Sequence, residues 1–346
     1  MKNGKRLKAL LGWLYALGAA FLLSACDALR EGNVIQPLVA APTVVALPTV
    51  LLPAATAVVP TQPPLFLPTN TAAPTPTDSP TATPENTPAA TPTPIPFGQL
   101  TIIGYSFEER AIEKYQFGQG PFHVIFVGGI HGGYEWNSTL LMYEFMDYLL
   151  ANPFLLPPAI TLHVIPVANP DGLHRVVGHN DRFAAWEISG NTFPGRFNGN
   201  NVDLNRNWEC NWRVEGVWRN RPVSGGAYPF SEPENQYLRT FIEAQQPLAV
   251  IFYHSAFDAI FTAGCPDVFA PSRELAEIYG LAANYPIYDH FPAYEITGDA
   301  GDYLATIGIP AFTVELSTHE ALDWDRNLRG IFALLNHLSD LPKVIE

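Results

Sequence analysis

The sequence predicts an α/β domain over residues 97–346, with a mixed, largely parallel central sheet flanked by helices, as one catalytic domain. Short runs of apolar and β-branched residues alternate along this part of the chain with segments in which apolar residues recur at helical spacing. The apolar runs are continuous rather than interrupted by polar residues, which is typical of strands buried on both faces of a parallel sheet.

Four apolar runs are predicted to form buried strands, at residues 123–130, 160–167, 248–253 and 309–316. Helices are predicted at residues 136–150, 231–246 and 325–338. The second of these begins with Ser231, Pro233 and Glu234, which suggests a serine cap, an early proline and a capping box. The segment 169–172, Asn-Pro-Asp-Gly, is predicted to form a turn that closes the second strand.

The first 96 residues are predicted to lie outside this domain. Basic residues precede the apolar run 9–23, and small residues lead to Cys26, which indicates a secretory signal peptide over residues 1–25. The ending resembles a bacterial lipobox, which implies that Cys26 is lipidated and tethers the chain to the membrane on its extracytoplasmic side. The alternative is an uncleaved signal anchor, and either way most of the chain leaves the cytoplasm. Fifteen of the 33 prolines lie between Pro42 and Pro96, so residues 26–96 are interpreted as a lipidated N-terminus and a semi-rigid stalk.

The charge and the cysteine content limit the possible partners and indicate a possible disulfide. The formal net charge is −14, and a basic surface for binding phosphates is missing, so nucleic acid is not an expected partner. With Cys26 assigned to the lipid, Cys210 and Cys265 could form a disulfide in an oxidising compartment, and the sequence leaves this open.

Polar residues follow three of the predicted strands. His131 and Glu135 follow the first, His254 follows the third, and Glu315 lies near the end of the fourth. Because ligands bind at the carboxyl ends of strands in open α/β sheets, two histidines and one carboxylate could hold one catalytic Zn²⁺ with an open position. Glu315 would then remain as a separate base. The other seven histidines are interpreted as structural or surface residues (123, 163, 174, 179, 290, 319 and 337).

Seven sequence blocks resemble the carboxypeptidase A/B family of zinc metallocarboxypeptidases. They are Gly-Gly-Ile-His-Gly at 128–132, Asn-Pro-Asp-Gly at 169–172, Gly-Arg-Phe-Asn at 195–198, Asp-Leu-Asn-Arg-Asn-Trp at 203–208, Phe-Ser-Glu-Pro-Glu at 230–234, Tyr-His-Ser at 253–255 and Thr-Val-Glu-Leu at 313–316. The resemblance extends over nearly all of residues 97–346, and the block at 203–208 is the most specific.

The resemblance implies a role for each matching residue. Asp203 would orient His131 from behind the metal, and Arg196 would stabilise the oxyanion, with Arg182 as an alternative that lacks the Gly-Arg-x-Asn context. Asn205 and Arg206 would bind the terminal carboxylate of the substrate. Tyr294 would cap the substrate, or it could be an ordinary packing residue in an aromatic segment.

One feature departs from the family pattern. Three residues separate His131 from Glu135, where the family usually has two. A turn at Gly132 and Gly133 could absorb the extra residue, because glycine adopts backbone angles that other residues avoid; otherwise the site is damaged.

The predicted function is therefore zinc-dependent hydrolysis of peptide bonds, with removal of C-terminal residues from peptides or cell-wall peptides. The expected partner is a peptide with a free C-terminal carboxylate. At the position that sets side-chain specificity in the family stands Gly301, which favours neither basic nor apolar residues. The alternatives are a non-catalytic binding lipoprotein and a zinc amide deacylase.

Overall fold

The computed structural model describes residues 96–341 of the chain. The predicted signal peptide, the lipidation site Cys26 and the predicted stalk as far as residue 95 lie outside the described residues. Within residues 96–341, no helix is long and apolar enough to cross a lipid bilayer.

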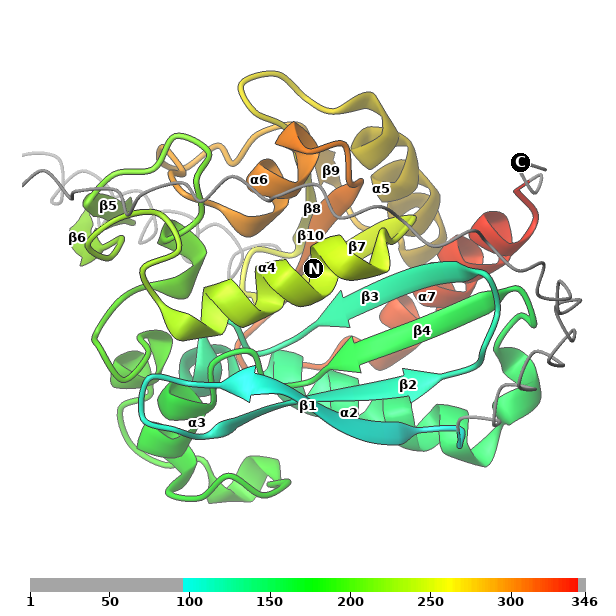
Figure 1. Ribbon diagram of the computed structural model, residues 1–346, viewed down its shortest axis with the longest axis horizontal. Helices are drawn as coiled ribbons and strands as arrows, with labels where there is room; N and C mark the ends of the chain where they lie inside the picture. Colours follow the sequence, from blue (N-terminus) through cyan, green and yellow to red (C-terminus); the bar gives the residue numbers. More distant parts are fainter. Residues whose placement is uncertain (1–95, 342–346) are drawn as a thin grey trace, which may run out of the picture. The chain divides into compact units, whose positions relative to one another are not determined.

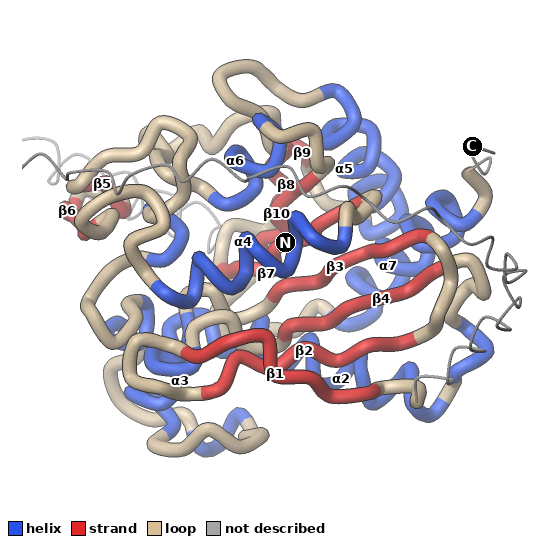
Figure 2. The backbone as a smooth tube through the Cα atoms, viewed as in Figure 1, coloured by secondary structure: helices blue, strands red, loops and turns tan. Residues whose placement is uncertain are grey.

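An eight-stranded sheet forms the centre of the described part (Figures 1 and 2). Across the sheet the order is β1 (Gln99–Tyr105), β2 (Ala111–Phe117), β4 (Ile160–Ile165), β3 (Phe122–Val127), β7 (Ala249–Ser255), β10 (Ala311–Leu316), β8 (Ala259–Thr262) and β9 (Ile287–Tyr288). The four central strands β4, β3, β7 and β10 run parallel, and β9 is parallel to β8. The pairs β1–β2, β2–β4 and β8–β10 are antiparallel. The predicted mixed, largely parallel sheet is confirmed.

Helices cover both faces of the sheet. They are α2 (Trp136–Ala151), α3 (Pro170–Val177), α4 (Pro233–Gln245), α5 (Ala270–Ala283), α6 (Ala300–Thr306) and α7 (Trp324–Ser339). In Figure 1, α4 crosses one side of the sheet, and α2 and α7 lie on the opposite side. Successive side chains of a strand point to opposite faces. Phe126 of β3 accordingly packs into a cluster with residues of α2, α5 and α7, whereas Ile125 packs into a second cluster with residues of α4 and α6.

The four central strands and three of the helices lie where the sequence predicts them, within three residues at each end. Two local predictions are wrong. The segment 169–172 is not a turn but the start of α3, in which the Asn169 side chain accepts a hydrogen bond from the Gly172 N–H and Pro170 takes the first helical position. Ser231 does not cap α4, because its hydroxyl bonds to the Glu232 carboxylate, and α4 begins at Pro233.

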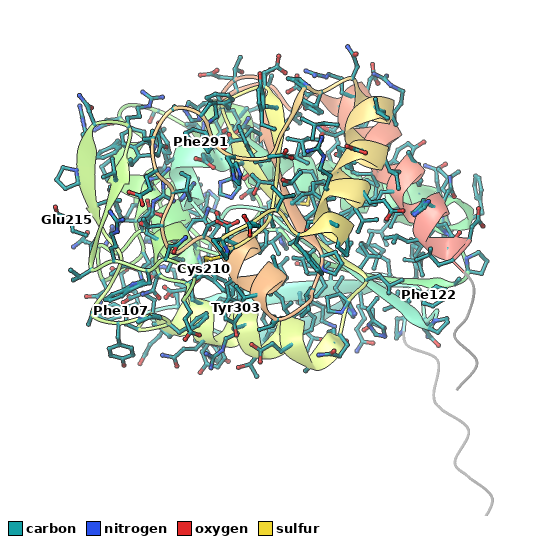
Figure 3. All side chains as sticks on the ribbon, turned by 90° about the horizontal axis from the view of Figure 1, so that it is seen from above. Phe107, Phe122, Cys210, Glu215, Phe291 and Tyr303 are labelled. Atoms are coloured by element: carbon teal, nitrogen blue, oxygen red, sulfur yellow. A yellow bond between two sulfur atoms is a disulfide. The ribbon has the colours of Figure 1, made fainter. Side chains whose placement is uncertain are left out.

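A separate two-stranded hairpin consists of β5 (Glu215–Trp218) and β6 (Arg221–Ser224). In Figure 3 the labelled Glu215 marks this hairpin at one edge of the view. The backbone carbonyl of Val217 accepts hydrogen bonds from the Arg206 guanidinium, which joins the hairpin to the segment that carries the Asp-Leu-Asn-Arg-Asn block.

Candidate active site

Three neighbouring strands bring the predicted metal ligands and the predicted base to one edge of the sheet. Because β3, β7 and β10 run parallel, their carboxyl ends meet there. His131 follows β3 after a short connection, and His254 lies near the end of β7. Glu315 of β10 is paired directly with His254 in the strand register. Residues far apart in the sequence thus share one site.

His131, Glu135 and His254 form a compact group of metal-binding side chains. Their ligand atoms lie within 4.8 Å of one another, and all three residues are buried. The two Nδ1 atoms are 3.2 Å apart, and the Glu135 carboxylate lies 2.8 Å from Nδ1 of His131 and 2.9 Å from Nδ1 of His254. Two imidazole nitrogens and a carboxylate are the donor set of a catalytic zinc site with an open position, so these residues fit a zinc ion.

The extra residue between His131 and Glu135 is absorbed by a short 3₁₀ helix, Gly132–Glu135. Gly132 has a φ of 43°, in the region that favours glycine, and a Cβ atom there would lie 2.7 Å from the backbone of Gly172. The turn delivers both oxygens of Glu135 to the histidines. Burial opposes ionisation of Glu135, but the facing histidines outweigh it and hold its pKa well below the ordinary value. The extra residue between His131 and Glu135 is therefore no reason to expect a damaged site.

Asp203 orients His131 from the side away from the other ligands. Its Oδ1 atom lies 3.2 Å from Nε2 of His131. Because an ionised carboxylate can only accept a hydrogen bond, Nε2 carries the proton, and the lone pair of Nδ1 points into the triad. Burial raises the pKa of Asp203, but the charge of Arg196, together with the hydrogen bond from His131, outweighs this and holds the pKa far below the ordinary value.

Arg196 links Asp203 to the metal ligands. Its Nε and Nη2 atoms lie 2.9 and 2.8 Å from Oδ2 of Asp203, and its Nη1 lies 3.5 Å from Oε1 of Glu135. The guanidinium carbon is 5.2 Å from the centre of the Trp218 ring. Arg182 instead forms an exposed ion pair with Asp147. The geometry favours Arg196 over Arg182 as the arginine of the site.

Asn205 and Arg206 lie side by side in the wall of the cavity. The Asn205 amide is fixed by Asp299, which accepts from it at 2.7 Å, and by the Ala300 N–H, which donates to it at 3.0 Å. Three of the five N–H donors of Arg206 are bonded to the carbonyls of Asn205 and Val217. The remaining donors are available to an anion in the cavity. The role of the pair as a carboxylate anchor stays a prediction.

One cavity of about 500 Å³ unites these residues. It is lined by all three triad residues and by Arg196, Asn205, Arg206, Tyr294 and Glu315, whereas Asp203 lies behind it. Burial, reinforced by the negative charge of Glu135, raises the pKa of Glu315 above the ordinary range of a carboxyl group. Tyr294 is half-buried, with its ring centre 4.8 Å from that of Phe291, whose position Figure 3 labels.

A disulfide joins Cys210 and Cys265, the two cysteines that the sequence left as a candidate pair. It connects the segment after Arg206 with the segment after β8. Asn211, next to one cysteine, and Gly264 and Pro266, next to the other, line the cavity. The bond therefore ties together two parts of the cavity wall. Figure 3 labels Cys210.

Several residues of the cavity wall were not predicted. Four of them are Tyr134 in the short 3₁₀ helix, Trp218 at the end of β5, Arg219 in the hairpin turn and His319 in a loop, and no periodic pattern marks these places. His319 was counted among the structural histidines, but its Nδ1 lies 3.0 Å from the Ser255 hydroxyl, and its ring packs 4.7 Å from that of Tyr134. The position of Tyr134 directly before Glu135 is the one signal that could have indicated it.

Comparison with known proteins agrees with this geometry. A family model described as zinc carboxypeptidase matches residues 97–326. Gamma-D-glutamyl-L-diamino acid endopeptidase 1 of Lysinibacillus sphaericus is 26% identical over 248 residues, which cover 64% of this chain and 61% of that protein. Murein peptide amidase A of Escherichia coli K12 is 28% identical over 232 residues, 63% of this chain and 80% of that protein.

The fold also matches solved structures. Bovine thrombin-activatable fibrinolysis inhibitor, in its complex with tick carboxypeptidase inhibitor, superposes with a TM-score of 0.57 at 20% identity, over 69% of this chain and 90% of that chain. That likeness concerns the fold alone. The family match covers most of the chain, and the triad has the donors that zinc requires. The chain belongs to the zinc carboxypeptidase family, a family of zinc-dependent peptide hydrolases.

Proposed function

We propose that this chain is a metallocarboxypeptidase that removes the C-terminal residue of a peptide. The observation that carries the proposal is the shared cavity, in which the zinc triad, the buried Glu315 carboxylate and the Asn205–Arg206 pair face one space. A planar guanidinium beside an amide suits a carboxylate. If the Asn205–Arg206 pair binds the terminal carboxylate, the peptide must end close to the scissile bond. This requirement favours an exopeptidase over an endopeptidase.

Each residue has a distinct task in the proposed reaction. His131, Glu135 and His254 would hold the zinc ion, which supplies positive charge that activates water and polarises a carbonyl group. Glu315 takes a proton from the attacking water and passes it to the leaving amine. The Arg196 guanidinium donates to the oxygen that gains negative charge, and its ion pair with Asp203 keeps it in place for this. Tyr294 closes over the bound residue.

Cell-wall peptides are the proposed substrate class. The names of two relatives refer to a γ-D-glutamyl-diamino acid bond and to murein peptide, and both proteins are similar to this chain over more than three fifths of its length. The proposed location is extracytoplasmic, with the chain tethered to the membrane through a lipid on Cys26. A membrane-tethered peptidase would lie close to the wall, which agrees with this substrate class.

The full chain, loaded with zinc, tests the proposal on peptides ending in Lys, Phe or diaminopimelate. We expect zinc-dependent release of one C-terminal residue from at least one of these peptides, and mass spectrometry of the products measures it. Exclusive cleavage at internal bonds would show an endopeptidase instead. Hydrolysis of N-acyl amino acids but of no peptide would favour a deacylase, and no turnover with any amide would favour a binding protein.

The Glu315→Gln chain provides the matched variant. We expect it to bind zinc with unchanged stoichiometry, since Glu315 lies outside the triad, while hydrolysis falls by a factor of roughly 10² to 10⁴, the usual contribution of a general base. Metal content by atomic emission and initial rates with the best peptide give the two readouts. A rate within tenfold of wild type would remove Glu315 from the proposed role.

A further inference from the structure

Arg219 is an unpaired cation in the wall of the active-site cavity. Its side chain is exposed, and its guanidinium carbon lies 4.8 Å from the centre of the Trp218 ring. Within residues 96–341, no carboxylate forms an ion pair with it. Glu295, which also lines the cavity, is already bonded to Arg213 at 2.7 Å. The positive charge of Arg219 is therefore available to a ligand.

The backbone at Arg219 is held in an unusual conformation. It is the first of two residues that connect β5 to β6, and its φ is 57°. In a two-residue hairpin this position usually holds glycine, because a side chain is unfavourable at positive φ. Such a strained residue at a cavity suggests a functional reason for its presence.

Arg219 acts on a definite part of the cavity. Its guanidinium stacks on the Trp218 ring, which in turn packs against Tyr134. The Tyr134 ring lies 5.5 Å from that of Trp218 and 4.7 Å from that of His319. Among the described residues, no group forms a hydrogen bond with the Tyr134 hydroxyl. A cation and a free hydroxyl donor therefore share this wall.

This wall differs from the part of the cavity that would bind the C-terminal carboxylate. Asn205 is bonded to Asp299 and Ala300 at the start of α6, and Arg206 links this part to the hairpin through the Val217 carbonyl, whereas Trp218 and His319 each pack against Tyr134. If the terminal carboxylate binds at Asn205 and the scissile bond lies at the metal ligands, the preceding residue would lie beyond them, on the side of Tyr134, which directly precedes Glu135 in the chain. The residue that precedes the scissile bond would meet Tyr134 and Arg219 there.

We propose that Arg219, together with the Tyr134 hydroxyl, binds a carboxylate on the residue that precedes the scissile bond, so that the enzyme prefers substrates that are anionic at this position. The inference rests on the proposed peptidase function and specifies its substrate class. The carboxylate could belong to the side chain of an α-linked Asp or Glu, or it could be the free α-carboxylate of a γ-linked glutamyl residue. Both present the same planar anion to a guanidinium.

The test compares peptides with one shared C-terminal residue and four different preceding residues: α-linked Glu, γ-linked D-Glu, Gln and Lys. With the zinc-loaded full chain we expect a lower KM for at least one of the two Glu peptides than for the Gln peptide, and the highest KM for the Lys peptide. The preference should be roughly three- to tenfold and should shrink with added salt, as expected for an exposed ion pair. The two Glu arms show which linkage supplies the carboxylate.

Arg219→Gly is the main variant, because glycine suits the positive φ and should leave the fold intact. We expect it to lose the preference for Glu over Gln, mainly through KM, with a much smaller change in kcat/KM for the Gln peptide. Arg219→Lys should keep part of the preference. Arg221→Gln is the matched control: Arg221 lies on the same hairpin, is also exposed, and stacks on Phe193 at 5.6 Å without lining the cavity.

The outcomes separate this inference from the proposed function. If the wild-type chain hydrolyses the Gln peptide as well as the Glu peptides, the peptidase function stands and the inference fails. An equal loss on all four peptides in Arg219→Gly would also overturn it, since Arg219 would then hold a group common to all. If no peptide is hydrolysed, the proposed function fails. In that case calorimetry measures the binding of the same peptides to the zinc-loaded Glu315→Gln chain and to the double variant that also carries Arg219→Gly. Equal affinities of the Glu315→Gln chain for the Glu and Gln peptides would overturn the inference.

Discussion

At the scale of single residues, a buried ion pair supports the metal ligands. Arg196 and Asp203 are both almost completely buried, and a buried charge is tolerated only with a partner. Each has a second task, since Asp203 also accepts from His131 and Arg196 also faces Glu135. The orientation of the first histidine and the position of the proposed oxyanion donor therefore depend on one carboxylate.

Replacing Asp203 with Asn tests this dependence. The variant removes the charge that pairs with Arg196 and weakens the acceptor for His131, so we expect zinc affinity to fall roughly 10- to 100-fold. Competition with a chromogenic chelator measures the change. Asp147→Asn serves as the control, because Asp147 also pairs with an arginine, but at the exposed surface. Equal zinc affinities for the two variants would contradict the role of Asp203.

The sequence could predict the residues of the site that stand in specific patterns. His131, His254 and Glu315 follow strands whose apolar runs are easy to recognise, and Asp203 to Arg206 lie in a distinctive block. Arg219 and His319 could not be predicted. They lie in a hairpin turn and a loop, where neither hydrophobic periodicity nor spacing marks a residue, and only the folded chain brings them to the cavity.

At the scale of secondary-structure elements, the 3₁₀ helix Gly132–Glu135 decides whether the third ligand reaches the metal site. It is packed closely against backbone: Cβ atoms at Gly132 and Gly133 would lie 2.7 Å from the Gly172 carbonyl carbon and 3.0 Å from the Gly172 carbonyl oxygen, respectively. A Cβ atom at Gly133 would also lie 2.5 Å from the Val176 side chain. Main-chain atoms cannot move aside as a flexible side chain does. The two glycines are therefore needed for close packing as well as for backbone freedom.

We expect Gly132→Ala to lower both stability and zinc affinity. The positive φ alone costs about 1–2 kcal/mol for alanine, and the close backbone contact adds to this. Gly178→Ala is the control, because Gly178 has a φ of 86° but no atom within 4 Å of its would-be Cβ. Denaturant unfolding should show a loss in both variants, and chelator competition should show weaker zinc binding in Gly132→Ala only. Unchanged zinc affinity in Gly132→Ala would show that the turn tolerates a side chain.

The elements themselves were predictable to different degrees. β3, β4, β7 and β10 are almost entirely buried, so their continuous apolar runs identify them. β1 is an exposed edge strand with a mixed pattern, and β9 has only two residues, so neither leaves a clear signal. The start of α3 was misread because Asn, Pro, Asp and Gly favour turns and helix starts alike, and only tertiary packing decides between them.

At the scale of the whole domain, buried ionisable groups link stability to pH. Glu234 at the start of α4 is fully buried, accepts hydrogen bonds from the Phe107 N–H and the Asn198 amide, and lies near Asp171. Burial, with a contribution from the charge of Asp171, raises its pKa to about 7. In the opposite sense, burial and the nearby Lys114 lower the pKa of His163 to about 3. The two groups therefore affect stability in opposite directions.

The sign for Glu234 follows from its raised pKa. Between about pH 4.5 and about pH 7 the unfolded chain releases this proton while the folded chain keeps it, so stability falls as pH rises, by about 3 kcal/mol in total. We expect the unfolding free energy of wild type minus that of Glu234→Gln to fall across this range and to level off above it. Urea titrations at pH 4.5, 6, 7 and 8 measure it, and the subtraction removes the contribution of His163. A constant difference would contradict the raised pKa.

The arrangement of β3, β7 and β10 also links the metal site to the assembly of the sheet. His131 and His254 are 123 residues apart in the chain, and their strands become neighbours only when the centre of the sheet has closed. Bringing such distant segments together is slow, because the entropy of a long loop is lost before any contact forms. The complete set of zinc ligands therefore exists only when this part of the sheet is assembled, so the metal site depends on long-range strand pairing and not on any local segment.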